Sequence, residues 1–311
     1  MSKRSKSKAM GKGRFRSDFR RNHQLYFMMI PVLIYFLLFC YLPMYGAIIA
    51  FMDYRPSLGV LGSDWVGLKH FRSFLSSPSF GNIFLNTVKI SISTLMFGFP
   101  APIVLALLMN EVRNKPFLKT VQNITYLPHF ISLVVVCGLI REFTRKDGLI
   151  GKIVLLLGGT PVNLLNHAEN FLPIYVISNI WQEVGWGTII YLAALTGIDQ
   201  QLYEAAQIDG AGKWKQMLHV TLPGITPTIV VMLIMRMGQM LNVGYEKVIL
   251  LYNDAIMSSA DVISSYVYRK GLIDLDWSFS SAVGLFNFSI NFVLLILANT
   301  LNKKWQGSSL W

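Results

Sequence analysis

The sequence predicts an all-α membrane protein with six transmembrane helices. Hydrophobic residues make up 53% of the chain and charged residues 14%, with a mean hydropathy of +0.47, which is too apolar for the mixed surface of a soluble domain. A helix needs about 20 apolar residues to cross the roughly 30 Å hydrocarbon core of a bilayer. Six segments meet this requirement: about 25–51, 83–109, 120–141, 171–197, 224–246 and 281–301. Polar residues interrupt the fourth and fifth.

The basic residues are distributed unevenly along the chain. There are 28 Lys and Arg against 16 Asp and Glu, a net charge of +12 that raises the question of nucleic-acid binding. Residues 1–24 hold nine of them, and the segments on the same side of a six-span chain hold 16 in total. This bias fits the positive-inside rule with both termini in the cytoplasm of a bacterial cell. The basic arm is interpreted as an orientation signal that attracts anionic lipid, and no nucleic-acid partner is expected.

Two regions of unequal size follow from the composition. Residues 1–24 form a basic cytoplasmic arm that nearly lacks apolar residues and is expected to be mobile until it meets lipid. Residues 25–311 form one transmembrane domain. Its outer loops, about 52–82, 142–170 and 253–280, are too short to be separate domains. Capture of a selective substrate is therefore expected to belong to a partner protein.

Helix-disrupting residues fall within several predicted spans. Such breaks are tolerated in a membrane where the freed backbone groups meet protein or a water-filled cavity, so they favour a pathway through the bundle. Proline and glycine are also common in ordinary spanning helices, which leaves a purely structural role open. The residues are Pro43 with Gly46, Gly98 with Pro100 and Pro102, Pro128, and Gly185 with Gly187.

The cytoplasmic loop between the fourth and fifth spans has the most distinctive pattern. Glu204, Ala205 and Ala206 favour a helix, and Gly210 allows a sharp turn. A second short helix is expected over 213–220, before Pro223 opens the next span. The paired alanines leave a shallow surface for a partner, and the glutamate offers a carboxylate to a basic residue. An ordinary amphipathic connector is the alternative reading of these properties.

The spacing of this loop resembles the EAA signature of the permease subunits of binding-protein-dependent ABC importers. The matching positions are Glu204, Ala205, Ala206, Gly210, Val220, Leu222 and Pro223. In that family the loop docks in a cleft of the cytoplasmic ATPase. The resemblance implies that Glu204 is the anchor and Gly210 the turn of a coupling loop over 204–223. The residues assigned to coupling are Glu204, Ala205, Ala206, Asp209, Gly210, Leu222 and Pro223.

Further segments look like the polysaccharide or aldouronate-type sugar permeases. They are 41–46, 65–71, 110–113, 126–132, 180–187 and the closing Ser309-Leu310-Trp311. The resemblance implies a type I (MetI-like) importer fold with its core over about 81–301. It also implies a second, different permease subunit, two ATPase subunits and a substrate-binding lipoprotein. No cofactor is expected on this chain, since ATP and Mg would be used by the partner ATPase.

Polar residues inside the predicted spans indicate where a substrate would pass, because charges near mid-bilayer usually face the bundle interior. They follow helical spacing on the fourth, fifth and sixth spans. The hypothesis is a sugar pathway in which Trp186 or Tyr191 provides a stacking surface. The alternative is structural: Glu183 pairs with Arg236, and the asparagines join helices. The candidates are Asn179, Glu183, Trp186, Tyr191, Arg236, Gln239, Asn242, Asn287 and Asn291. His129 is assigned no chemistry.

Other classes of function fit the sequence less well. The chain has no Gly-x-x-x-x-Gly-Lys-Ser/Thr loop, so it is not itself the ATPase. A membrane-embedded serine protease would need an activated serine beside a histidine, and neither that pattern nor His-Glu-x-x-His occurs. No metal site is expected, and Cys40 and Cys137 show no paired spacing. An ion-coupled secondary transporter would show paired repeats, and no convincing repeat relates the first three spans to the last three. An ABC importer for a non-sugar solute stays open, as do the length and charge of any sugar.

Overall fold

The computed structural model describes the backbone of residues 12–306 and the side chains of residues 19 and 21–303. The first part of the chain forms α1 (Lys12–Tyr35), η1 (Phe36–Tyr41), α2 (Leu42–Met44), η2 (Tyr45–Phe51), β1 (Met52–Asp53), β2 (Asp64–Trp65), α3 (Lys69–Leu75), α4 (Phe80–Ser93), η3 (Thr94–Gly98) and α5 (Pro100–Glu111). The middle part forms α6 (Lys115–Tyr126), η4 (Leu127–Phe130), α7 (Leu133–Thr144), α8 (Leu149–Leu156), η5 (Leu164–Asn166) and α9 (Ala168–Thr196). The last part forms α10 (Gln200–Ile208), α11 (Lys213–Gln216), η6 (Met217–Thr221), α12 (Leu222–Met237), α13 (Tyr245–Leu251), α14 (Met257–Ala260), α15 (Ile263–Tyr268), η7 (Arg269–Ile273) and α16 (Trp277–Gln306).

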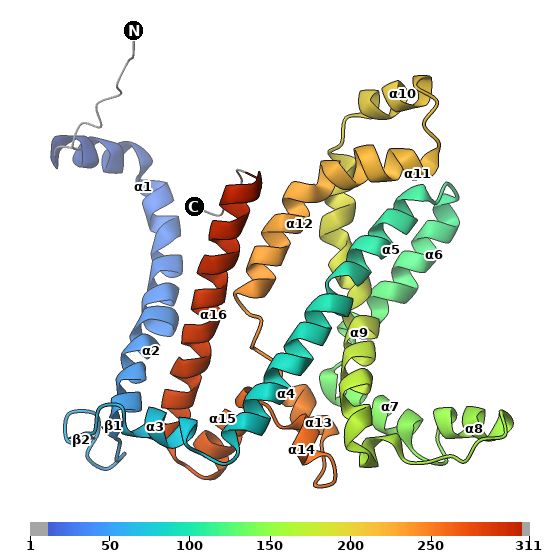
Figure 1. Ribbon diagram of the computed structural model, residues 1–311. Helices are drawn as coiled ribbons and strands as arrows, with labels where there is room; N and C mark the ends of the chain where they lie inside the picture. Colours follow the sequence, from blue (N-terminus) through green and yellow to red (C-terminus); the bar gives the residue numbers. More distant parts are fainter. Residues whose placement is uncertain (1–11, 307–311) are drawn as a thin grey trace.

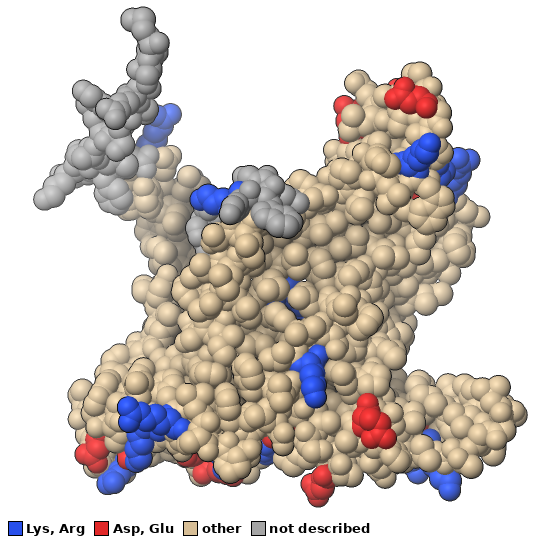
Figure 2. All heavy atoms as spheres, in the orientation of Figure 1, with Lys and Arg blue, Asp and Glu red and all other residues tan. Residues whose placement is uncertain are grey.

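The long helices run between two ends of the molecule (Figure 1). At the tip end, α10 and α11 project from the bundle, and α1 begins and α16 ends at this same end. At the loop end lie α3, α7, α8 and the two-stranded antiparallel pair β1–β2, in which Met52 is opposite Trp65. Charged side chains gather at the two ends, and the band between them carries few (Figure 2). Such a band suits the hydrocarbon region of a bilayer.

Four of the predicted spans are long apolar helices. Within residues 12–306, the helical stretches long and apolar enough to cross a membrane are Arg21–Phe51, Phe80–Glu111, Lys213–Met237 and Trp277–Lys303. They correspond to the first, second, fifth and sixth predicted spans. The bent pair Lys115–Phe130 and Leu133–Leu156 passes the same test when its two parts are taken together.

The third predicted span, 120–141, is not a straight helix. The chain bends by 101° between Phe130 and Leu133, so α6 runs along the bundle while α7 and α8 lie across its loop end (Figure 1). Pro128 lies in the short 3-10 turn before the bend, and Ser132 caps α7 by accepting a hydrogen bond from Val135 N at 3.4 Å. A proline-containing turn followed by a serine cap ends one helix and starts another.

The fifth predicted span, 224–246, has different limits from those expected. Its helix begins at Lys213, since α11, η6 and α12 are continuous, and it ends at Met237. Pro223 therefore lies inside a helix already under way and does not open it. Residues 238–244 form turns and extended chain before α13 begins. This segment leaves backbone groups in the middle of the bundle, where other protein groups must satisfy them.

The other predicted breaks do not interrupt their helices. The wide π turns η1, η3 and η6 end two residues before Pro43, Pro100 and Pro223, respectively. A proline removes one backbone N–H and crowds the carbonyl four residues earlier, and a wide turn relieves that crowding without ending the helix.

The glycines of α9 serve close packing. A Cβ on Gly185 would overlap the backbone carbonyl of Thr125 in α6, and one on Gly187 would lie 2.8 Å from Cγ of Pro102 in α5. The fourth predicted span is the unbroken 29-residue helix α9, which packs against α5, α6 and α12.

The N-terminal arm is helical where it is described. The backbone forms a helix from Lys12, with a kink at Asn22. The mobility expected of residues 1–24 stays a prediction. The earlier half, and the closing Ser309-Leu310-Trp311, lie outside the described residues. Beyond the kink, the apolar window of the first long helix has no buried residue. Its surface is therefore left for lipid or another chain.

Three apolar clusters hold the bundle together. One joins α7, α9 and α13 and includes Phe171, Val248 and Leu251. A second joins α5, α9 and α12, and a third joins α3, α4, α15 and α16 around Phe74. Because α9 takes part in two of them, its polar face is fixed relative to α4, α12 and α13.

An ion pair anchors the chain at the loop end. Lys69 Nζ donates to Asp53 Oδ2 at 2.7 Å, and this hydrogen bond holds the pKa of the Asp53 carboxyl below its ordinary value. The bond ties the start of α3 to the end of β1.

Candidate functional site: an exposed tip and two polar cavities

The tip is a helix–turn–helix built by local sequence signals. Asp199 caps α10, since its Oδ1 accepts a hydrogen bond from Gln201 N at 2.9 Å. Gly210 has φ +74°, a conformation that favours glycine, and Ala211 N donates to Ala206 O at 2.8 Å to close the helix. Gln216 Nε2 donates to Ala211 O at 2.7 Å and holds the second helix against the turn. The helix, turn and helix predicted for this loop are confirmed.

The tip presents a mixed apolar and acidic surface beyond the bundle. Glu204 and Asp209 are exposed, and Figure 2 shows acidic side chains at the top of the tip. Ile208 and Trp214 expose 88% and 73% of their surface. Large apolar side chains so exposed at a projecting end, beside a fixed carboxylate, are typical of a docking surface. Of the other coupling candidates, Ala205 is exposed, Ala206 is half-buried, and Leu222 and Pro223 lie in the first turn of α12.

Few side-chain contacts hold the tip to the bundle. Tyr203 and Thr221 share a hydrogen bond of 3.0 Å between their hydroxyls, which ties α10 to the helix that continues into α12. Lys213 Nζ lies 3.2 Å from Glu111 Oε2 at the end of α5. These contacts and the continuous helix Lys213–Met237 connect the tip to α12.

The polar residues of the spans converge on two adjoining cavities. The loop-side cavity, about 330 Å³, lies among α4, α9, α13 and residues 240–244. The tip-side cavity, about 480 Å³, lies among α5, α9 and α12. The loop-side lining is Ile90, Ser91, Thr94, Leu133, Tyr175, Asn179, Gln182, Glu183, Arg236, Met240, Asn242, Val243, Gly244 and Lys247. The tip-side lining is Thr94, Gly98, Phe99, Pro102, Asn179, Glu183, Trp186, Gly187, Tyr191, Met232 and Arg236. Thr94, Asn179, Glu183 and Arg236 belong to both.

Glu183 is held by a residue to which the sequence assigned no role. His129 Nδ1 lies 2.9 Å from Glu183 Oε2, and the imidazole stacks on Trp186 with a centroid distance of 4.5 Å and an interplanar angle of 4°. The ion pairs of the described residues do not include Glu183 with Arg236, so the pairing suggested from the sequence is wrong. The bend after α6 brings His129 to α9, which helical spacing within α9 does not reveal.

The polar candidates of the fifth span do not lie on one helix face. Arg236 lies in the last turn of α12, whereas Gln239 and Asn242 lie in the irregular segment that follows it. Arg236 and Asn242 line the loop-side cavity, whereas Gln239 lines neither polar cavity. The helix stops at Met237, so the spacing rule for a continuous helix does not apply beyond it.

Asn287 and Asn291 join α16 to the segment after α12. Both donate from Nδ2 to Asn242 Oδ1, at 3.0 and 3.1 Å. Asn291 Oδ1 accepts from Leu241 N at 2.9 Å, which satisfies a backbone group left over where the helix ends. These bonds match the structural alternative for the two asparagines. They also explain how irregular chain is tolerated inside the bundle.

Sequence reasoning missed several cavity residues. Ser91, Gln182 and Lys247 are buried and line the loop-side cavity. Lys247 directly follows the predicted end of the fifth span, where a lysine is expected to be a solvent-exposed loop residue. Ser91 and Thr94 sit in an apolar span, where small hydroxyl residues are common. Helical spacing could have identified two of these residues. Ser91 is three positions from Thr94 in the second span, and Gln182 is three positions from Asn179 in the fourth.

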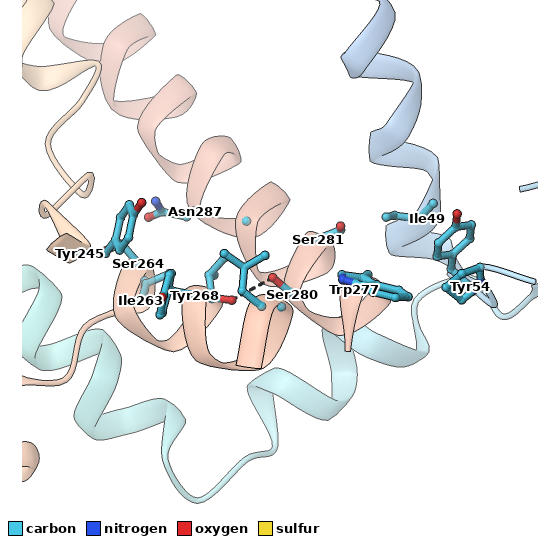
Figure 3. Close-up of a pocket in the computed structure, with 15 residues that line it drawn as sticks. Ile49, Tyr54, Tyr245, Ile263, Ser264, Tyr268, Trp277, Ser280, Ser281 and Asn287 are labelled. Carbon is cyan, nitrogen blue, oxygen red and sulfur yellow. Dashed lines mark hydrogen bonds between the residues drawn. The ribbon is translucent and has the colours of Figure 1, made fainter. Parts of the chain in front are cut away.

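A third cavity, of about 640 Å³, lies near the loop end between η2, α15 and α16. Figure 3 shows Tyr245 at one side and Trp277, Tyr54 and Ile49 toward the other. Its lining contains no charged residue. The two polar cavities, in contrast, are both lined by the charged residues Glu183 and Arg236. In residues 12–306, no group of three or more His, Cys, Asp and Glu side chains is arranged to hold a metal ion.

The family model described as "binding-protein-dependent transport system inner membrane component" matches residues 98–307, which include both the tip and most of the cavity residues. The chain belongs to this family. It is a helical, MetI-like membrane component of an ABC importer, and its exposed tip contains the 204–223 signature. The resemblance to this family stated from the sequence is confirmed. The count of six transmembrane helices stays a prediction, since the described residues give four apolar spans, or five with the bent pair.

Relatives of known name cover nearly the whole length of this transport component. It is 48% identical over 288 residues to the polygalacturonan/rhamnogalacturonan transport system permease protein YteP of Bacillus subtilis, covering 92% of this chain and 90% of that protein. It is 44% identical to Protein LplB of Bacillus subtilis, with coverage of 94% and 92%. A crystal structure of a bacterial alginate ABC transporter, in complex with an alginate pentasaccharide-bound periplasmic protein, contains a chain that aligns with a TM-score of 0.87 and 41% identity, covering 94% of this chain and 99% of that chain.

Proposed function

We propose that this chain is the permease subunit of an ATP-driven importer of oligosaccharides released from polysaccharides, in which it forms half of the translocation pathway. The observation that carries the proposal is the combination of a projecting acidic and apolar tip with polar cavities in the same bundle. The tip is suited to a cytoplasmic ATPase, and α12 links it directly to Arg236 at the cavities. Two of the named relatives, the polygalacturonan/rhamnogalacturonan permease protein and the alginate ABC transporter, support a saccharide as the solute.

The partners follow from what the chain exposes. Glu204, Ala205 and Gly210 belong to the surface that would enter the ATPase cleft, with two ATPase subunits using ATP and Mg. The unpartnered apolar surface of α1 to η2 is available to lipid and to a second permease subunit. A binding lipoprotein would deliver the solute at the loop end. Because α1 begins and α16 ends at the same end of the bundle as the tip, the proposal places both termini in the cytoplasm of a bacterial cell (Figure 1).

Within the cavities, the proposal assigns different roles to the candidate residues. Trp186 is 45% exposed and faces the tip-side cavity, so it offers a flat surface to a sugar ring. Asn179, Glu183 and Arg236 offer hydrogen bonds to hydroxyls in both cavities. Tyr191 is 3% exposed and packs in the α5–α9–α12 cluster, so its contribution is mainly structural.

The test is reconstitution of the complete importer. The chain is co-expressed with its second permease and ATPase subunits, purified as a complex and placed in liposomes with its binding protein. ATP-dependent accumulation of a labelled oligosaccharide is the expected result. A complex that assembles with the ATPase but accumulates only a non-saccharide solute would overturn the sugar assignment. A lone chain that transports without any ATPase would overturn the importer assignment itself.

A further inference from the structure

Unpartnered polar atoms gather at the loop-side cavity. Among the described residues, four buried side-chain nitrogen or oxygen atoms have no hydrogen-bond partner: Ser91 Oγ, Thr94 Oγ1, Lys247 Nζ and Asn287 Oδ1. The first three belong to residues that line the loop-side cavity. Buried polar groups are nearly always paired, so three unpartnered atoms around one space mark a place where a hydrogen-bonding ligand can bind. All three are hydrogen-bond donors.

Lys247 is the most costly of the three to leave unpaired. Its side chain is 4% exposed, and Nζ lies 5.1 Å from the centroid of the Tyr175 ring. That ring attracts a cation but does not replace a hydrogen-bond acceptor. A buried ammonium without a counter-ion is strongly disfavoured, whereas an ammonium that receives a carboxylate is stabilised. In the described part of the chain, no carboxylate lies within 4.0 Å of Lys247 Nζ.

The charges around the cavity favour an anion. The lining contains two cations, Lys247 and Arg236, and one carboxylate, Glu183. The side chain of Glu183 already contacts His129, whose Nδ1 lies 2.9 Å from Glu183 Oε2. Arg236 has no ion pair with any side chain of residues 21–303. The cavity therefore has more positive charge than its own acidic group balances.

We propose that Lys247, Ser91 and Thr94 form a carboxylate-binding subsite in the pathway, so that the transported oligosaccharides contain uronic acid units. The lysine ammonium and the two hydroxyls donate to the sugar carboxylate, and Arg236 provides the second cation on the way to the tip-side cavity. The flexible four-carbon stem of lysine allows Nζ to leave the Tyr175 ring and follow the carboxylate. This inference rests on the proposed function and names its substrate class.

The test separates the subsite from the importer function. ATP-driven uptake of a labelled uronic acid trisaccharide by the complete wild-type importer is measured first, and failure to take up any oligosaccharide would overturn the proposed function. Binding to the purified complex is then compared, without the binding protein, for the uronic acid trisaccharide and its carboxyl-reduced neutral counterpart. The wild-type complex is expected to bind the acidic form more tightly. Equal affinity, or preference for the neutral form, would overturn the subsite.

Variants of Lys247 test whether this residue is the source of the preference for the acidic trisaccharide. Lys247→Met is expected to weaken binding of the acidic trisaccharide roughly tenfold or more, the effect of one charge-assisted hydrogen bond, and to leave the neutral form unchanged. Lys247→Arg retains the preference. Lys270→Met is the matched control, since Lys270 lies near the loop end but pairs with Asp274 at 2.8 Å; it is expected to change neither affinity. Equal weakening for both sugars in Lys247→Met would show a merely structural role.

A second set of changes covers the case in which Lys247→Met fails to assemble. Ser91→Ala combined with Thr94→Val removes both hydroxyls and keeps their approximate volume. The double variant is expected to reduce the preference for the acidic sugar several-fold, since each hydroxyl supplies one donor to the carboxylate. An unchanged preference in this variant would overturn the subsite as described.

Discussion

The tip and the loop-side cavity are built in opposite ways. The tip is a continuous stretch of about 25 residues whose helices, cap and turn are set by neighbours in the sequence, and most of its surface is exposed. The cavity takes its lining from α4, α9, α13 and the chain after α12, residues up to 157 positions apart, from Ile90 to Lys247. A surface that meets another protein can be encoded locally. A space inside a bundle exists only after several helices have packed.

The largest expected effect concerns the tip. Glu204→Ala is expected to weaken association with the ATPase by about 4 kcal/mol, since it leaves a basic partner unpaired in the interface. The fold should be unaffected because Glu204 is exposed. Binding of the purified ATPase to the permease complex measures the change. Glu169→Ala removes an equally exposed carboxylate at the loop end and should have no effect. Equal binding by Glu204→Ala and wild type would contradict the docking role.

The packing that creates the cavities is expected to be nearly as sensitive. Gly185→Ala places a Cβ against the backbone carbonyl of Thr125, which moves only if α6 shifts from α9. We expect a loss of about 3 kcal/mol, at the upper end for overpacking, seen as a lower Tm and yield of the purified protein. Gly284→Ala in α16 meets no atom within 4 Å and should leave Tm unchanged or slightly higher. Similar losses in both variants would mean that close approach is not the cause.

A smaller loss of stability is expected from the asparagine link. Asn291→Ala removes the acceptor of Leu241 N and one donor to Asn242, leaving a buried backbone group unpaired. The expected cost is about 1–3 kcal/mol in thermal or denaturant unfolding. Ser289→Ala, on the same helix, loses only a bond to its own preceding turn and is the control. If Asn291→Ala kept full stability but lost sugar binding, the residue would belong to the pathway and not to the scaffold.

The smallest effect is expected where the tip meets α5. The Lys213–Glu111 ion pair is largely exposed, with 61% and 37% of the two side chains accessible, so water screens it. Lys213→Ala is expected to change stability by less than about 1 kcal/mol, and a double-mutant cycle with Glu111→Ala measures the pair itself. A coupling energy clearly above this limit would show that the tip is held rigidly by the pair and not by the continuous helix.

Local patterns predicted what neighbours in the chain control. The apolar runs located the first, second, fifth and sixth spans, and the spacing from Glu204 to Pro223 identified the tip and the family. The limits of the fifth span were wrong because Met240, Leu241 and Val243 look like a continuation of the apolar run, whereas the helix ends at Met237. The break near Pro128 was expected, but its 101° bend was not, since the direction of α7 depends on its packing with α9 and α13.

The sequence alone determined that the chain lies in a membrane, which loop carries the family signature and the family to which the chain belongs, because hydropathy and a contiguous motif need no tertiary contacts. Only the tertiary structure decided which polar residues face one another. Glu183 contacts His129 and not Arg236. Asn287 and Asn291 bind the chain that follows the end of α12, and Lys247 is buried at a cavity. The physical reason is that the environment of a polar side chain is set by the helices packed around it, and these come from distant parts of the chain.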